Sequence, residues 1–399
     1  MATKVQGEHR RPPPAAFNLS LNNPTVRAIL YQIIVLGAVA FVVWYLVSNT
    51  IQNLETRKIA SGFTFLYREA GFAIGEGLVE FSPADTYLDA FWVGLLNTLR
   101  VAVIGIVFAT IFGTILGVAR LSRNWLVARA ASLYVEFIRN IPLLLQLFFW
   151  WSVFRDIFPG PRQALSPVAG VYFSNRGVNF AVPVSDPVHW YMAGAFVIAV
   201  FASILVHRWA TRRQQMTGEQ FPTILTGLGL LFGLPLAVFL IGGAPTTFDW
   251  PELRGFNFVG GSTVTPEFTA LLIGLIMYTA GFIAEIVRAG ILAVSHGQTE
   301  AALALGLTRG RVLRLVILPQ ALRVIIPPMI SQYLNLTKNS SLAVAIGYPD
   351  IVSIANTAIN QTGQAIEGIA IIMIVYLTFS LSISAFMNWY NRYIALVER

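Results

Sequence analysis

The chain has 399 residues, of which 56% are hydrophobic and 12% charged, and its mean hydropathy is +0.66. This composition is too apolar for a soluble domain. The sequence contains no cysteine, which excludes disulfides, cysteine metal sites and thiol chemistry. The net charge of +8 comes mostly from arginines gathered on one side of the predicted membrane spans, so it does not indicate a nucleic-acid-binding protein.

Eight segments are apolar and long enough to cross the hydrocarbon core, which takes about 20 residues per helix. They are residues 28–47, 92–118, 133–153, 191–206, 223–241, 268–292, 321–346 and 369–388. The fourth is the shortest, so seven spans is the alternative count. The sequence therefore predicts an all-α polytopic membrane protein with about eight transmembrane helices.

The N-terminal part is expected to be a tail, an anchor and a loop. Residues 1–27 carry three consecutive prolines and predict a disordered cytoplasmic tail. Residues 28–90 contain the first span, which is too long for a signal peptide and is interpreted as a retained anchor, and a periplasmic loop. Ser82-Pro83-Ala84-Asp85 at the loop's end predicts a short interfacial helix, because serine caps helices and proline suits their first turn. Thr265-Pro266-Glu267 repeats this signal before the sixth span.

The placement of basic residues predicts the orientation, because cytoplasmic loops carry the excess of Lys and Arg. An even number of spans puts both termini on one side, and that side holds the arginine-rich connections around Arg120, Arg208 and Arg309. Both termini are therefore expected in the cytoplasm, as is the connection formed by residues 295–319. Several passes through the lipid bilayer are expected, and a location in the bacterial inner membrane is implied by the family resemblance given below.

Two acidic and basic pairs lie near the inner ends of predicted spans: Glu136 with Arg139, and Glu285 with Arg288. Each pair is spaced i, i+3, which places both charges on one helix face. The simpler interpretation is local pairing at the interface, because unpaired charge inside a membrane is costly. The other interpretation is a gate, or a link to the cytoplasmic connection that follows the sixth span.

Residues 298–319 predict a helical hairpin on the cytoplasmic side. Ala301, Ala302 and Ala304 would let a partner protein approach the first helix closely. Gly306 can take positive φ and end that helix. Thr308 is a candidate N-cap for the second, basic helix, and Pro319 limits how far that helix runs unkinked. The alternative interpretation is an ordinary amphipathic hairpin at the interface.

The seventh span carries a polar face. Ser331, Asn335 and Lys338 are spaced i, i+4, i+7, so a helix places them on one side. Polar groups at this depth are expected to face the bundle interior or a water-filled cavity, which makes these residues candidates for a translocation pathway. Lys338 would attract a substrate carboxylate. Snorkelling and hydrogen bonding between helices remain the alternatives.

The sequence contains no motif typical of an enzyme active site or a metal site. Its only lysines are Lys4, Lys58 and Lys338, and none lies in a phosphate-binding loop, so ATP hydrolysis is not expected in this chain. The four histidines are scattered without metal-ligand spacing, and no catalytic nucleophile motif occurs. No catalytic site, metal site or cofactor is predicted.

Several motifs resemble the polar amino-acid permeases of ATP-binding-cassette (ABC) importers, the MetI-like or HisM-type family. Glu300-Ala301-Ala302, Gly306 and Leu318-Pro319, preceded by Gln298, resemble the family's coupling loop. Four further stretches follow the family's order; they are residues 94–99, 139–144, 284–291 and 338–342. The last one has Asn339 where the family has aspartate, which leaves a role for that carboxylate without support here.

The resemblance implies a five-helix permease core of type I, MetI-like fold, split into residues 91–156 and 267–399. Residues 157–266 would be an insertion of periplasmic loops with two extra transmembrane helices. An additional N-terminal span and an insertion of this size resemble the Q-type permease subunit of general L-amino acid transport systems.

By the same resemblance, the protein would be the transmembrane permease subunit of an importer for L-amino acids. Partner ATPase subunits, which bind ATP and Mg, would dock on the coupling loop through Gln298, Glu300, Ala301, Ala302, Gly306, Leu318 and Pro319. A second permease, expected to be a different chain, and a periplasmic amino-acid-binding protein would complete the complex. An ion-coupled secondary transporter and a non-transporting membrane assembly protein are the alternatives.

Overall fold

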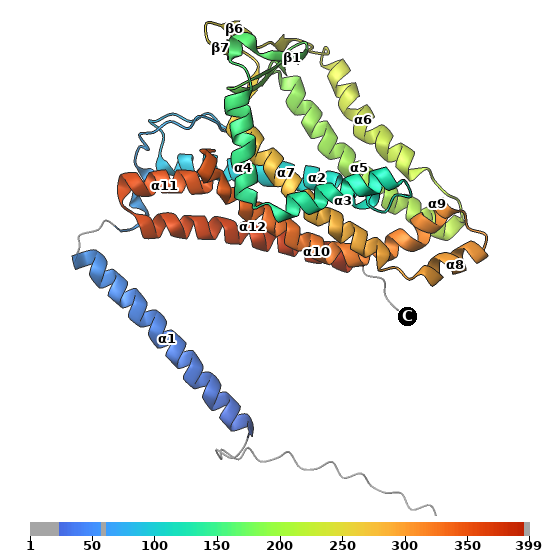
Figure 1. The fold of residues 1–399 in the computed structure, drawn as a ribbon, viewed down its shortest axis with the longest axis horizontal. Helices are drawn as coiled ribbons and strands as arrows, with labels where there is room; N and C mark the ends of the chain where they lie inside the picture. The colour runs from blue at the N-terminus through green and yellow to red at the C-terminus, as the bar shows by residue number, and fades with distance from the viewer. Residues whose placement is uncertain (1–23, 57–60, 395–399) are drawn as a thin grey trace, which may run out of the picture.

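The computed structural model describes residues 24–56 and 61–394, and this part of the chain is mostly helical (Figure 1). Seven of its helices are long and apolar enough to cross a membrane, or eight if one bent pair counts as a span, which agrees with the predicted number. The long helices are α1 (Pro24–Thr56), α2 (Tyr87–Ala119), α5 (Pro187–Thr217), α6 (Thr223–Ile241), α7 (Pro266–Leu292), α10 (Leu318–Asn339) and α12 (Ala365–Ile394).

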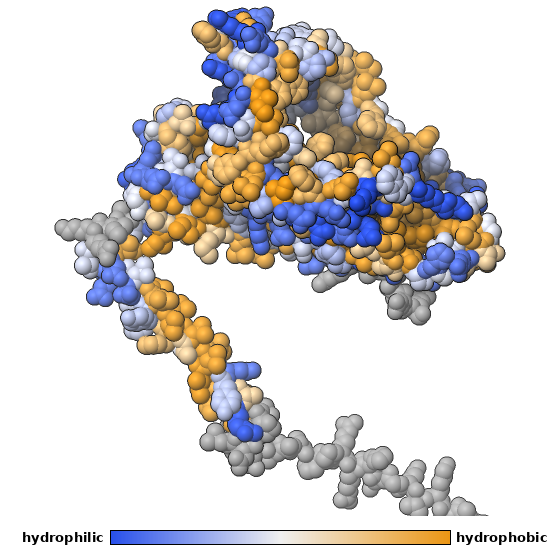
Figure 2. Space-filling view, viewed as in Figure 1, coloured by the Kyte–Doolittle hydropathy of each residue, from blue (hydrophilic) through white to orange (hydrophobic). Residues whose placement is uncertain are grey.

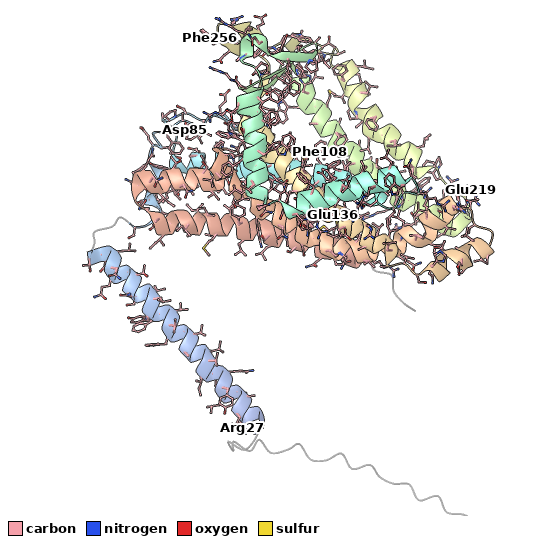
Figure 3. The ribbon with its side chains drawn as sticks, viewed as in Figure 1. Arg27, Asp85, Phe108, Glu136, Glu219 and Phe256 are labelled. Atoms are coloured by element: carbon pink, nitrogen blue, oxygen red, sulfur yellow. The ribbon has the colours of Figure 1, made fainter. Side chains whose placement is uncertain are left out.

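The first helix, α1, stands apart from the bundle (Figure 1). Its apolar window is fully exposed, and Figure 2 shows a hydrophobic middle between more polar ends. Arg27 lies at its N-terminal end (Figure 3). This is the pattern of an anchor surrounded by lipid. The tail predicted for residues 1–27 lies outside the described residues, apart from its end, which forms the first turn of α1.

The core is built around α2 and α7. Leu271, Leu275 and Ile283 of α7 are fully buried. A Cβ added to Gly113 of α2 would lie 2.6 Å from the Ile283 side chain, and one added to Gly117 would lie 2.8 Å from the Ala284 carbonyl oxygen. Small residues four positions apart thus bring the two backbones close together, as in other membrane helix pairs.

The third predicted span, residues 133–153, is not one helix. It is divided into α3 (Trp125–Asn140) and α4 (Leu143–Ser152), and the pair is bent by 103°. The break falls at Ile141, which is extended at φ −100° and ψ 128° and precedes Pro142. The ring of a proline disfavours helical geometry in the residue before it, so the sequence itself explains the bend.

The predicted interfacial helix at residues 82–85 is wrong. These residues form a turn, in which the Asp85 amide donates to the Ser82 carbonyl (2.9 Å) and the Ser82 amide donates to the Asp85 carboxylate (2.7 Å). Such local side-chain bonds compete with helix formation. Helix α2 begins later, where Thr86 and Asp89 form a capping box. At the sixth span the same signal is confirmed, because Thr265 caps α7 by accepting from the Phe268 amide (3.1 Å).

A small β module, residues 165–183 and 248–264, joins the two outer connections of the insertion. Four strands form an antiparallel sheet in the order β1-β2-β3-β8. They are β1 (Leu165–Val168), β2 (Val171–Ser174), β3 (Gly177–Phe180) and β8 (Ser262–Val264). Two shorter ribbons pair β4 (Val182–Pro183) with β5 (Phe248–Asp249), and β6 (Glu252–Arg254) with β7 (Asn257–Val259). Phe256 marks the turn between β6 and β7 (Figure 3). The all-α prediction therefore applies to the membrane part alone.

The two extra spans are confirmed as helices α5 and α6. They pack against each other as a hairpin that descends from the β module toward the end of the bundle that carries α9 (Arg309–Val312) (Figure 1). Asp186 caps α5 by accepting from the Val188 amide (2.8 Å), and Gly218 ends α5 in a left-handed conformation.

Candidate functional site: coupling hairpin, inner charge cluster and polar face of α10

The predicted hairpin is present as α8 (His296–Ala304) followed by α9. Gly306 has φ +77°, as predicted. The Leu307 amide donates to the Ala302 carbonyl (3.2 Å) and the Gly306 amide to the Leu303 carbonyl (2.9 Å). These two bonds form a Schellman motif, which satisfies the last carbonyls of α8 and fixes the turn.

One face of the hairpin is internal, and the rest is exposed. Ala302 is 5% exposed and Val312 is buried where α8 meets α9 and the following turn, so the expectation that Ala302 is presented to a partner is wrong. Ala301, Ala304 and Leu305 are exposed, and Leu305 at the tip is 83% exposed. Glu300 and Gln298 are exposed too, and Glu300 contacts the His296 ring (3.0 Å).

The hairpin is continuous with the seventh span. After α9 the chain makes a π-helical turn, η4 (Leu313–Ile317), and enters α10 at Leu318 and Pro319, both of which are exposed. At the end of the π turn the Leu318 amide donates to the Leu313 carbonyl, five residues earlier. The next residue, Pro319, has no backbone N–H to donate. Thr308 occupies the N-cap position of α9, but its side chain makes no capping bond.

The inner charges form one cluster across three helices. Glu285 of α7 accepts from Arg288 (3.2 Å) and from Arg120 at the end of α2, and its carboxylate lies 3.7 Å from Arg139 of α3. The predicted pairing of Glu285 with Arg288 is confirmed. The pairing of Glu136 with Arg139 is wrong. Glu136 is exposed on α3 (Figure 3) and has no ion pair within the described part of the chain, because Arg139 turns toward α7.

The predicted polar face of α10 is present and uncovered. Ser331, Asn335 and Lys338 are exposed, whereas Leu336 and Thr337 of the same turns are buried. In the described residues the Lys338 side chain has neither an ion pair nor a hydrogen bond. The prolines of residues 327–328 lie inside α10, which continues through them to Asn339.

Two polar groups near the N-terminal ends of α7 and α11 (Ile351–Thr362) were not predicted from the sequence. Asp350 follows the 3-10 turn η5 (Ser340–Ile346) and caps α11 by accepting from the Ser353 amide (2.8 Å). Glu76 pairs with Arg100 (2.8 Å) and accepts from the Thr265 hydroxyl. An aspartate directly before an apolar periodic segment is a capping signal, so Asp350 was recognisable from the sequence.

Burial changes the acidity of both groups. It raises the pKa of Asp350 to about 7, although the Ser353 backbone amide opposes this by favouring the charged form. Burial also raises the pKa of Glu76, against the lowering effects of Thr265 and Arg100. Arg100 is held over the Phe268 ring at 4.0 Å, so the Glu76 pair joins the loop before α2 to the middle of α2 and to the start of α7.

A bundle of apolar helices with a stiff, exposed polar hairpin and no phosphate-binding loop in its sequence has the architecture of a membrane transport subunit. Residues 221–395 match the family described as "Binding-protein-dependent transport system inner membrane component". The chain belongs to the permeases of amino-acid ABC importers, the class of MetI-like fold.

Three relatives match almost the whole chain. The general L-amino acid transport system permease protein AapQ of Rhizobium johnstonii is 51% identical over 96% of this chain and 96% of its own length. The putative amino-acid ABC transporter permease protein YhdX of Escherichia coli is 51% identical over 96% of this chain and 98% of its own. The glutamate/glutamine/aspartate/asparagine transport system permease protein BztB of Rhodobacter capsulatus is 44% identical over 97% and 99%.

The family defines the role of this chain. It is a multi-pass inner-membrane permease of an amino-acid ABC importer, and not the ATPase. A permease of this kind works with an ATPase and a binding protein.

Proposed function

We propose that this permease carries general L-amino acids inward, together with a second and different permease chain, and that ATPase subunits drive it through the α8–α9 hairpin. ATP and Mg are held by those subunits. A periplasmic amino-acid-binding protein delivers the substrate. The names of AapQ and BztB, which describe general L-amino acids and acidic amino acids with their amides, support this substrate class.

The hairpin carries the docking proposal. Gln298, Glu300 and Ala301 lie on its exposed side, and Leu305 projects from its tip. Ala302 does not contact the partner in this proposal. Its buried side chain packs α8 against the segment that leads to α10 and so fixes the shape of the docking surface. Gly306 fixes the turn, and Leu318 with Pro319 marks where the hairpin enters the membrane. The helical run Arg309–Ile346 then connects a push on the hairpin to the polar face of α10.

The pathway is proposed along that face. Ser331, Asn335 and Lys338 are left open by this chain alone, and a second permease opposite them would close a polar passage. Lys338 contributes the positive charge that attracts a substrate carboxylate.

The inner charge cluster is proposed as the link between hairpin and bundle. Glu285 gathers Arg120, Arg139 and Arg288 just before α7 leads into α8, so α2, α3 and α7 respond together to movement of the hairpin. Both termini are proposed to lie in the cytoplasm, on the same side as this cluster, because the arginine-rich connections gather there.

Replacement of Gly306 tests the docking role. Gly306→Asp places a side chain where φ is +77° and adds charge to the docking face, so we expect normal insertion and loss of ATP-driven uptake. Gly218→Asp is the matched control, since Gly218 is exposed, has φ +74° and ends α5 outside the hairpin. Membrane abundance and uptake are measured together. Full uptake by the Gly306 variant would contradict the proposal.

A further inference from the structure

Helix α5 of the insertion is buried on one side only. Ala195 and Ala199 are buried where α5 packs against α6. On the opposite side Val197, Phe201 and Leu205 follow one another every four residues, and all three are exposed. These three residues form an apolar stripe along a helix that is long and apolar enough to span the membrane. Such a stripe is a surface on which acyl chains can lie.

The apolar stripe leads into two arginines on the same side of α5. Arg208 and Arg212 follow Phe201 by seven and eleven residues, which is about two and three turns of the helix. Both side chains are exposed, and neither has an ion pair or a side-chain hydrogen bond among the described residues. An exposed apolar stripe that ends in two uncompensated cations is complementary to an amphiphile with an anionic head.

The third arginine of this segment is already compensated. Arg213 donates to the Glu219 carboxylate (2.6 Å), and its guanidinium lies 5.5 Å from the centre of the Trp209 ring. Trp209 in turn packs edge to face against Phe221 (5.4 Å). Glu219 lies in the turn between α5 and α6 (Figure 3). The carboxylate of this turn is therefore used by Arg213, while Trp209 marks the level of the membrane surface, where tryptophan is enriched.

We infer that Arg208 and Arg212 bind the phosphate of an anionic phospholipid, whose acyl chains lie along the apolar stripe. A guanidinium binds phosphate oxygens through two parallel hydrogen bonds, and side chains four residues apart on a helix are close enough to share one phosphate. Their two positive charges favour a lipid of net negative charge, such as phosphatidylglycerol, over a zwitterionic one. The continuous apolar stripe favours a lipid over an acidic segment of a partner protein.

The lipid would hold a part of the molecule that has few protein contacts. In the described part of the chain, α5 and α6 pack chiefly against each other, and the β module connects them to the bundle at one end of the hairpin. The arginine pair lies near the other end. A bound headgroup there fixes the position of the hairpin at the membrane surface without a contact to another helix.

The test uses the intact complex of permeases and ATPases in phosphatidylcholine nanodiscs that contain a trace of a photoactivatable lipid. The probe is either phosphatidylglycerol or phosphatidylcholine, with the same photoreactive group in the acyl chain. Labelled positions are mapped on chymotryptic peptides, because replacing arginine would remove trypsin sites. We expect phosphatidylglycerol to label residues 197–205 at least about fivefold more than phosphatidylcholine. Residues 36–47 of the exposed anchor α1 serve as the internal reference and should be labelled equally by both probes.

Two double variants separate a specific site from diffuse charge. Arg208→Gln with Arg212→Gln should reduce the preference for phosphatidylglycerol on α5 to the value found on α1. Arg123→Gln with Arg129→Gln removes the same charge from exposed positions at the start of α3 and should leave the preference on α5 unchanged. Retained ATPase association confirms that each variant is assembled.

Three outcomes would overturn the inference. They are equal labelling of α5 by both probes in the wild-type complex, an unchanged preference after replacement of Arg208 and Arg212, and an equal loss in both double variants. Labelling does not require transport, so these outcomes are independent of the proposed function.

Discussion

The Arg120 guanidinium donates to the Glu285 carboxylate and so joins the inner end of α2 to α7. Arg120 is the more enclosed of the two, with a side chain 10% exposed against 32% for Glu285. Because two further arginines share this carboxylate, one acidic side chain lies within ion-pair distance of three cations. The contact therefore holds three helices together at the side of the membrane where the hairpin emerges.

Removing the negative charge of Glu285 should destabilise the contact between α2, α3 and α7. Glu285→Gln leaves Arg120 partly buried without its counter-ion, and we expect a loss of about 1–2 kcal/mol, reduced by solvent screening. Thermal unfolding of the purified protein in detergent measures it. Glu136→Gln is the matched control, because Glu136 is exposed and has no ion pair in the described residues. An equal effect of both changes would contradict the cluster.

Close packing of α2 on α7 should be sensitive to one methyl group. The Cβ of Gly113→Ala would meet the Ile283 side chain at 2.6 Å and the Ala280 carbonyl at 2.9 Å, which forces the helices apart. We expect a destabilisation of about 1–3 kcal/mol. Gly229→Ala on exposed α6 meets nothing within 4 Å and should leave the thermal unfolding temperature unchanged or slightly raised. Tolerance of Gly113→Ala would mean that the two helices are less close than described.

The buried Asp350 should make stability depend on pH. Its pKa is raised in the folded protein to about 7, from 3.8, so the folded state holds a proton that the unfolded chain releases. Stability is then highest below pH 4 for this group and falls as the pH rises to about 7, by a few kcal/mol in order of magnitude. Unfolding temperature in detergent is measured across this window.

Asp350→Asn isolates that contribution. Asparagine keeps an oxygen for the Ser353 amide but does not titrate, so the decline with pH should become shallower. Glu76, whose raised pKa acts in the same direction, remains in both proteins and cancels in the difference. An unchanged slope would show that Asp350 is not the buried acid.

Pairing of the two outer connections can be tested with cysteines, because the sequence contains none. Val178 of β3 faces Val264 of β8 across the sheet, so Val178→Cys with Val264→Cys should form a disulfide under mild oxidation. Val168→Cys with Val264→Cys joins opposite edges of the sheet and should not. Titration of free thiols distinguishes the pairs. Crosslinking of the edge pair would contradict the strand order.

Local signals in the sequence predicted local structure. Thr265 as a cap, Gly306 in positive φ and the apolar lengths of α5 and α6 depend on a few neighbouring residues. Pro142 carried enough information to predict the bend before α4, but hydropathy averaged over residues 133–153 concealed it. The turn at Ser82 was misread because serine and proline signal turns as well as helix starts.

Contacts between residues far apart in the chain could not be predicted from the sequence. Glu285 is far in the chain from both Arg120 and Arg139. The i, i+3 spacing therefore predicted that Arg139 pairs with Glu136, whereas in the structure Arg139 lies near Glu285. Strands of two to four residues separated by a helical hairpin give no periodic pattern. Burial of Ala302 depends on how α8 packs against α9 and η4. The docking and pathway residues remain predictions.

Strand β8 runs through Thr265 directly into α7, while β3 precedes α5. The sheet is thus connected through β8 to the central helix of the bundle and, from the neighbouring strand β3 by way of β4, to an accessory helical pair. A tilt of α7 during the transport cycle has to reorient the sheet, with no slack segment between them to absorb it. A partner protein that contacted the sheet would therefore move together with α7.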